Sequence, residues 1–160
     1  MTPAEVHRLR AEIKSDRSAF DGRLEELSGL DADPSDVATL AQMAVALHHA
    51  YGAIEAALSR VARLLEGSLP QGADWHQQLL QTMGLEIVAV RPAVLSAETT
   101  AGLRRLLAFR HFFRHAYAVS WDSEQLASLK GAAVSVRAPL ALDLDALDAF
   151  LARLAATLAE

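Results

Sequence analysis

Apolar side chains recur three and four residues apart along most of the chain, a spacing that places them on one face of an α-helix. The clearest example is residues 37–65, where the alternation continues over about four heptads. Its apolar positions are Val37, Leu40, Ala44, Leu47, Tyr51, Ile54, Leu58, Val61 and Leu65. We expect Asp33 to cap this helix with Pro34 at its first position, and Gly67 to end it. These nine apolar positions form a regular seam along the helix, which predicts packing against other long helices.

Two more helices are predicted in the first half of the chain. Residues 3–27 have an amphipathic spacing, and residues 75–83 predict a short helix opened by a capping box of Asp74 and Gln77. The segment at 85–92, "LEIVAVRP", contains β-branched residues but has no convincing pairing partner elsewhere in the chain. We therefore expect irregular structure there and no sheet.

The C-terminal part of the chain predicts three further helices. Ser96 caps one that runs to about Ser120, and Asp122 caps one that runs to about Val136. Pro139 interrupts, and "DLDALDAFLARLAATL" forms the last helix. The fold class is therefore expected to be all-α, an up-and-down bundle of about four to six helices with short loops.

Composition indicates one folded domain, residues 1–160. The chain is 52% hydrophobic and 22% charged, which fits an ordinary globular protein. It has no cysteine, so neither a disulfide nor a thiolate metal site is possible. The charged N-terminal segment does not resemble a signal peptide, and no segment approaches the roughly 18 apolar residues of a membrane span. We expect a cytoplasmic protein with no membrane partner.

Positive charge is concentrated in residues 99–121, although the net charge of the chain is −5. This segment holds four arginines, two histidines and no acid: Arg104, Arg105, Arg110, Arg114, His111 and His115. The overall charge argues against a generally basic nucleic-acid binder, but a local basic stripe can attract phosphate.

The stretch "RHFFRHAY", residues 110–117, concentrates two arginines, two histidines and a tyrosine within eight residues. His111 and His115 are four residues apart and share a helix face, whereas Arg110 and His115 point about 140° apart. Arg110 and His115 converge only if the chain bends or if a dimer brings in a second copy of the helix.

Three interpretations of this stretch stay open on residue types alone. The histidines could be metal ligands, but no third ligand is obvious and the HExxH pattern is missing. A histidine could act as general acid–base and an arginine as a phosphate clamp, which is the chemistry that RNA cleavage needs. The charges could also form a solvated face, with Phe109, Phe112, Phe113 and Tyr117 in the core.

The spacing Arg110-x4-His115-x-Tyr117 resembles the motif of the HEPN-domain ribonuclease toxins of the HepT type. The resemblance extends over about residues 37–117, because four blocks, the last of which contains the motif, stand in the order and spacing typical of that family. The blocks are "HHAYGAIEAAL", "LPQGADWHQQLLQTM", "RPAVLSAET" and "FRHFFRHAY". The C-terminal third agrees only loosely with the family.

The resemblance implies a HEPN-like helical bundle that forms homodimers and cleaves RNA without a metal ion or other cofactor. By resemblance, His115 is the acid–base that assists attack by the RNA 2′-OH, and Arg110 stabilises the charge on the phosphate. His111 and Arg114 are expected to support them. Arg104 and Arg105 are candidates for contacts to the RNA backbone, although a solvated face explains both equally well.

The resemblance also implies a protein partner. In HepT-type systems a minimal nucleotidyltransferase (MNT) antitoxin transfers AMP to the motif tyrosine, here Tyr117, which would block RNA by volume and charge. The alternative reading of Tyr117 is a core or interface residue. The alternative for the whole protein is an inactive HEPN-like dimer that binds nucleotide or a nucleotidyltransferase, and a helical scaffold without a ligand is a third possibility.

Residues outside the motif have weaker indications. Trp75 and His76 resemble a Trp-His pair of the family, but a tryptophan at a helix start more often seals a core edge. His48 and His49 are expected to pack or to face solvent. Glu55 could pair with an arginine of the motif from a neighbouring helix, or could be a plain surface residue.

Overall fold

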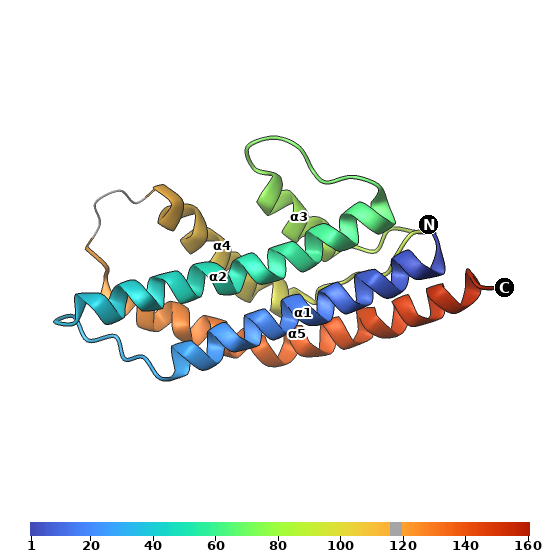
Figure 1. Ribbon diagram of the computed structural model, residues 1–160. Coiled ribbons are helices and arrows are strands. Elements are labelled where there is room, and N and C mark those ends of the chain that lie inside the picture. The colour runs from blue at the N-terminus through green and yellow to red at the C-terminus, as the bar shows by residue number, and fades with distance from the viewer. Residues whose placement is uncertain (116–119) are drawn as a thin grey trace.

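The computed structural model describes residues 1–115 and 120–160, apart from the side chain of residue 115. The described residues form five α-helices and one short π-helical segment (Figure 1). These are α1 (Pro3–Ser28), α2 (Val37–Val61), η1 (Ala62–Glu66), α3 (Trp75–Met83), α4 (Ala97–His115) and α5 (Ser123–Thr157). Ile87 and Arg91 form an isolated β-bridge, and the described residues contain no β-strand. The all-α prediction is confirmed.

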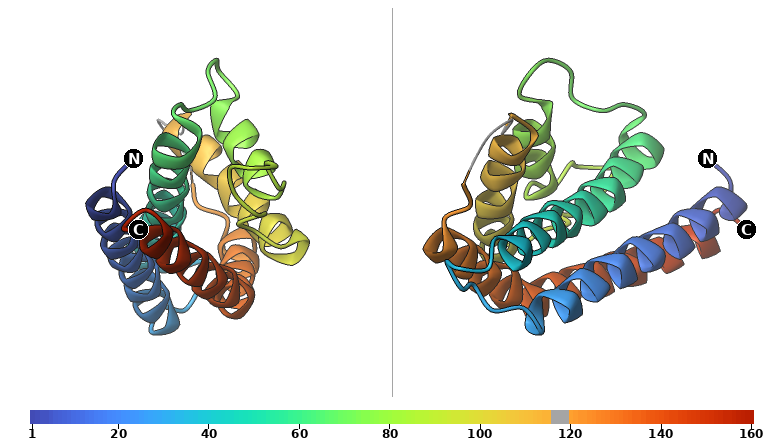
Figure 2. Two further views of the ribbon diagram at one scale, coloured as in Figure 1. Left: turned by 90° about the vertical axis from the view of Figure 1, so that its right-hand side faces the viewer. Right: turned by 60° about the vertical axis from the view of Figure 1, so that its left-hand side comes forward.

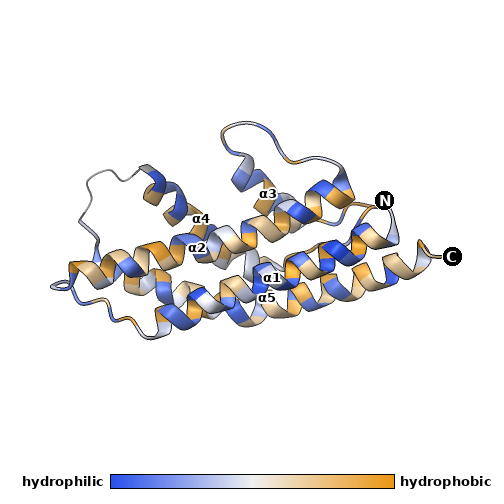
Figure 3. Ribbon diagram, viewed as in Figure 1, coloured by the Kyte–Doolittle hydropathy of each residue, from blue (hydrophilic) through white to orange (hydrophobic). Residues whose placement is uncertain are grey.

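The helix α2 lies at the centre of the bundle. It contacts α1 and α5 on one side and α3 and α4 on the other, and α1 runs antiparallel to both α2 and α5 (Figures 1 and 2). Apart from exposed Val37 and half-buried Leu65, the predicted seam of this helix is buried, and Met43, Ala46 and Ala50 are buried beside it. A helix that is apolar over most of its circumference is a core helix, which explains its position. The other helices carry mixed hydrophilic and hydrophobic residues (Figure 3).

The start of α2 differs from the prediction. Asp36, not Asp33, is the cap, and its carboxylate accepts a hydrogen bond from the Thr39 backbone N–H at 3.0 Å. The Asp33 carboxylate instead accepts from the Ser35 backbone N–H at 2.8 Å, so Asp33 and Pro34 belong to a turn before the helix. At the other end, Gly67 closes η1 in the left-handed region with φ 79°.

The starts of α3 and α4 lie where they were expected, but only one of the two expected capping hydrogen bonds is present among the described residues. Trp75–Met83 forms the expected short helix. The Asp74 side chain makes no capping hydrogen bond to the backbone of this fully described helix, so the predicted capping box is wrong. Ser96 does cap α4, because its hydroxyl accepts from the Thr99 backbone N–H at 3.2 Å.

The C-terminal part forms one helix where two were predicted. Asp122 caps α5 as expected, but the helix then runs unbroken through Pro139. Buried side chains keep helical spacing across the proline, namely Val136, Leu140, Leu144, Leu147 and Leu151. Their packing against the bundle outweighs the backbone hydrogen bond that proline cannot donate. No helix among the described residues has the length and apolar character that crossing a bilayer requires.

Candidate functional site

Three helices each contribute one side chain to a charged cluster at the centre of the candidate site. Glu55 of α2 is only 7% exposed. Its Oε1 lies 3.1 Å from Nη2 of Arg110 on α4, and its Oε2 lies 2.7 Å from Nδ1 of His76 on α3. A buried carboxylate is stable only when it is paired, so Glu55 fixes the directions of both partners. We call Glu55, His76 and Arg110 the charged cluster.

Aromatic side chains surround the charged cluster. The rings of Trp75 and His76 stack with centroids 3.8 Å apart, and the Arg110 guanidinium lies 6.0 Å from the centre of the Tyr51 ring. Burial, reinforced by the Glu55 carboxylate, raises the pKa of Tyr51 far above its usual value near 10, against a smaller opposing effect of Arg110. Tyr51 therefore stays neutral under physiological conditions.

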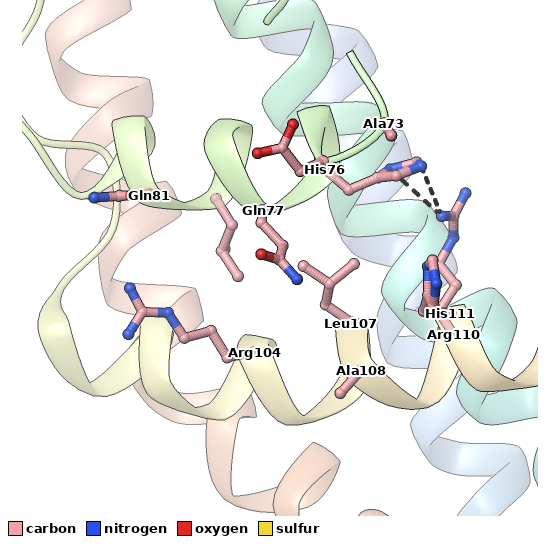
Figure 4. A pocket seen from close by; sticks show the side chains of 11 residues that line it. Ala73, His76, Gln77, Gln81, Arg104, Leu107, Ala108, Arg110 and His111 are labelled. Atoms are coloured by element: carbon pink, nitrogen blue, oxygen red, sulfur yellow. Dashed lines mark hydrogen bonds between the residues drawn. The ribbon is translucent and has the colours of Figure 1, made fainter. Parts of the chain in front are cut away.

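The charged cluster borders a cavity of about 690 Å³ between α3 and α4. Figure 4 shows His76 and Arg110 at one end of this cavity and Arg104 towards the other, with Gln77 between them. The full lining is Ala73, Asp74, His76, Gln77, Leu80, Gln81, Arg104, Leu107, Ala108, Arg110 and His111. Its volume lies within the ordinary range of small-ligand sites, and its basic groups suit an anionic ligand.

The structure separates the residues that the sequence proposed for the site. Arg104, Arg110 and His111 line the cavity together. Arg105 lies on the other side of α4, where its Nη2 donates to the Ser128 hydroxyl of α5 at 2.8 Å. Arg104 and Arg105 thus do not share one surface, as expected from the 100° turn between neighbouring helical residues.

The last part of the motif is only partly described. Arg114 is exposed. The backbone of His115 ends α4, but its side chain lies outside the described part of the chain, as does Tyr117. Within the described residues, no three His, Cys, Asp or Glu side chains form a group that could hold a metal ion.

The three phenylalanines in and directly before the motif have different environments. Phe109 is 3% exposed and therefore belongs to the core. Phe113 is half-buried and stacks on His48 with ring centroids 4.5 Å apart. Phe112 is 42% exposed, so the reading that placed all three in the core is wrong for this residue.

Sequence reasoning missed the position of His76 and found that of Glu55. The interpretation that Glu55 pairs with an arginine of the motif is confirmed. The sequence indicates only that His76 stands beside Trp75 near a helix start, but a buried carboxylate with two oxygens leaves room for a second hydrogen-bond partner besides the arginine. A glutamate directly beside the apolar seam of α2 is the signal that could have indicated such a partner.

These features define a class of protein: an all-α bundle in which a central helix anchors an arginine and a histidine beside a cavity. Comparison with known families matches residues 42–152 to the family described as HepT-like protein, so the chain belongs to the HepT-like family, whose fold is the HEPN helical bundle. No curated protein and no solved structure matches the chain.

Proposed function

We propose that the protein is a metal-independent endoribonuclease, the toxin of a HEPN/MNT toxin–antitoxin pair. One observation carries the proposal. The guanidinium of Arg110 is anchored by Glu55 at 3.1 Å and lines a cavity of about 690 Å³ with Arg104 and His111. A fixed guanidinium beside an open cavity is suited to bind a phosphate that gains charge during reaction. Membership of the HepT-like family, typically ribonucleases, supports the same chemistry.

The proposed reaction is attack of an RNA 2′-OH on the adjacent phosphorus. His115 accepts the proton of the 2′-OH, and Arg110 stabilises the negative charge that develops on the phosphate oxygens. The products are a 2′,3′-cyclic phosphate and a 5′-OH. His111 and Arg104 assist by contacting neighbouring phosphates, because both line the same cavity. Exposed Arg114 adds positive charge near the site. Arg105 contacts the phosphate backbone of a longer RNA.

Regulation follows from the same proposal. Two copies form a homodimer whose motifs face each other across a cleft. A cognate MNT antitoxin transfers AMP to Tyr117, and the added anionic group excludes RNA from the site by volume and charge.

The test is cleavage of an end-labelled RNA in EDTA by the purified protein, beside Arg110→Ala, His115→Ala and a DNA of the same sequence. The intact mass is measured first, so that an AMP adduct is not mistaken for inactivity. The proposal predicts that the wild type cuts RNA and not DNA, and that both variants lose at least about 100-fold in rate. Equal cutting by the variants would contradict it.

A second function is a HEPN-like module that binds nucleotide without cleaving RNA. The cavity volume favours it, because about 690 Å³ is enough for a mononucleotide-sized ligand. Titration calorimetry with AMP and ATP, which measures nucleotide binding, distinguishes this module from the ribonuclease. Nucleotide binding by a wild type that cuts no RNA would favour the module.

A further inference from the structure

Outside the Arg-x4-His motif, the cavity carries a histidine that is held from three directions. The side chain of His76 is 14% exposed, and its Nδ1 lies 2.7 Å from the Glu55 carboxylate. Its ring stacks on Trp75, and Nη1 of Arg110 approaches both ring nitrogens to 3.4 Å (Figure 4). A ring fixed so firmly presents the same edge to any ligand that enters the cavity.

The contact with Glu55 determines which ring nitrogen is available for chemistry. A carboxylate only accepts hydrogen bonds, so ionised Glu55 keeps a proton on Nδ1 of His76. Nε2 is then the nitrogen that can exchange a proton with a ligand. The same relation holds in hydrolases where a buried carboxylate orients a catalytic histidine and compensates its charge when it is protonated.

The contact with Arg110 places a bound phosphate near that nitrogen. Because Nη1 of Arg110 is 3.4 Å from Nε2 of His76, a phosphate that accepts a hydrogen bond from this guanidinium can also place an oxygen within hydrogen-bond distance of Nε2. We propose that His76 is the general acid of the RNA cleavage reaction, which protonates the leaving 5′-oxygen. This inference rests on the proposed ribonuclease function.

The step balances with groups that the protein and substrate supply. The 2′-oxygen forms a bond to phosphorus, and the bond from phosphorus to the 5′-oxygen breaks. The electron pair of that bond stays on the 5′-oxygen, which takes the proton from Nε2 of His76. The proton of the 2′-OH passes to His115, so no other reactant is needed. Glu55 compensates the imidazolium charge of His76 before the transfer.

A change of leaving group tests the assignment. In an RNA whose 5′-bridging oxygen is replaced by sulfur at the cleavage site, the leaving group departs as a thiolate and needs no proton. We expect His76→Ala to cut ordinary RNA about 100-fold to 10,000-fold more slowly than wild type and to cut the sulfur-containing RNA at close to the wild-type rate. Arg110→Ala should be slow on both RNAs. His7→Ala, at an exposed position of α1, should match wild type on both.

Any other pattern of rates for His76→Ala on the two RNAs would contradict the role of His76 as general acid. Equal losses on both RNAs would make His76 a structural or positioning residue, and wild-type rates on ordinary RNA would remove it from the reaction. If His76→Ala does not fold, His76→Gln keeps an amide donor for Glu55, cannot transfer a proton and gives the same comparison. A wild type that cuts ordinary RNA while His76→Ala loses both substrates refutes this inference alone. A wild type that cuts neither refutes the proposed function as well.

Discussion

The side chain of Arg91 is fully enclosed and bonded along its whole guanidinium. Its Nε donates to Glu66 at 2.8 Å, and its Nη atoms donate to the backbone carbonyls of Thr82, Leu85 and Pro92 at 2.9–3.1 Å. These contacts connect the end of η1, the end of α3 and the irregular segment before α4. One residue therefore organises the connection that positions α3 over the cavity.

Arg91→Met should lower the free energy of unfolding by roughly 3 kcal/mol or more, because it leaves the partly buried carboxylate of Glu66 and three backbone carbonyls without their donor. Urea unfolding measures the effect. The matched control is Arg153→Met at an exposed position, which should change stability by less than about 0.5 kcal/mol. Equal effects of the two substitutions would contradict this account of Arg91.

His48 provides a prediction about pH. Burial lowers the pKa of His48, and the neighbouring Arg110, His49 and Arg114 add to the effect. Its folded pKa thus lies below the unfolded value of about 6.5, so the unfolded state binds more protons in this range. His48 costs no stability well above pH 6.5 and becomes destabilising as the pH falls from there through the folded pKa.

His48→Phe removes this titration and keeps a ring that can stack on Phe113. The stability of the variant relative to wild type should therefore rise as the pH falls from 8 to about 5.5. Thermal unfolding at several pH values gives the comparison. A difference that does not change with pH would show that His48 is not the group responsible.

At the scale of the elements, Gly102 sets how closely α4 approaches α5. A Cβ at this position would lie 2.8 Å from Cγ2 and 3.0 Å from Cβ of Val136, which is too close for either helix to accept unchanged. Gly131 of α5 is the matched control, because a Cβ there meets nothing within 4 Å. The two glycines differ in packing and not in secondary structure.

Alanine substitutions should therefore have opposite effects on stability. Gly131→Ala should stabilise the protein by about 0.5–1 kcal/mol through helix propensity, whereas Gly102→Ala should destabilise it by about 1–3 kcal/mol through overpacking. Adding Val136→Ala should recover part of the second loss, since it removes the clashing methyl group. Chemical denaturation measures all three proteins, and a stabilising Gly102→Ala would contradict the close approach.

The elements also show what the sequence could and could not predict. Helical spacing and cap residues together located every described helix, although they divided α5 into two, because burying an apolar face is the main requirement on each helix. The local rules for proline and for caps gave wrong results at Pro139, Asp33 and Asp74, since tertiary packing carries α5 through the proline and the Asp33 side chain bonds within a turn. The pairing of Glu55 with an arginine of the motif could be predicted as one of two possibilities, because this carboxylate lies beside the apolar seam of α2. The cavity could not, because the loops that orient α3 over α4 have no periodic pattern.

At the scale of the whole molecule, Phe112 is the candidate anchor of the proposed homodimer. It is 42% exposed on α4, inside the motif itself, and a large exposed aromatic ring in that position favours an interface. Phe112→Glu should sediment as a single 17.2-kDa chain at micromolar concentration and lose RNA cleavage with the dimer.

The control for this prediction is Val88→Glu, because Val88 is 82% exposed in the irregular segment before α4. That variant should keep the dimer and the activity of wild type. A wild type that sediments as a monomer, or a Phe112→Glu protein that remains a dimer, would contradict the proposed interface.

The proposed ribonuclease reaction depends on the 2′-OH of the RNA substrate. To test this, a cleavage site is mapped on RNA in EDTA, and the single 2′-OH on the 5′ side of that site is then replaced by hydrogen. We expect this replacement to abolish cleavage at the site, and the ordinary RNA to be cut to a 2′,3′-cyclic phosphate and a 5′-OH. Continued cleavage of the 2′-deoxy substrate, or no cleavage of any RNA by the unmodified dimer, would contradict it.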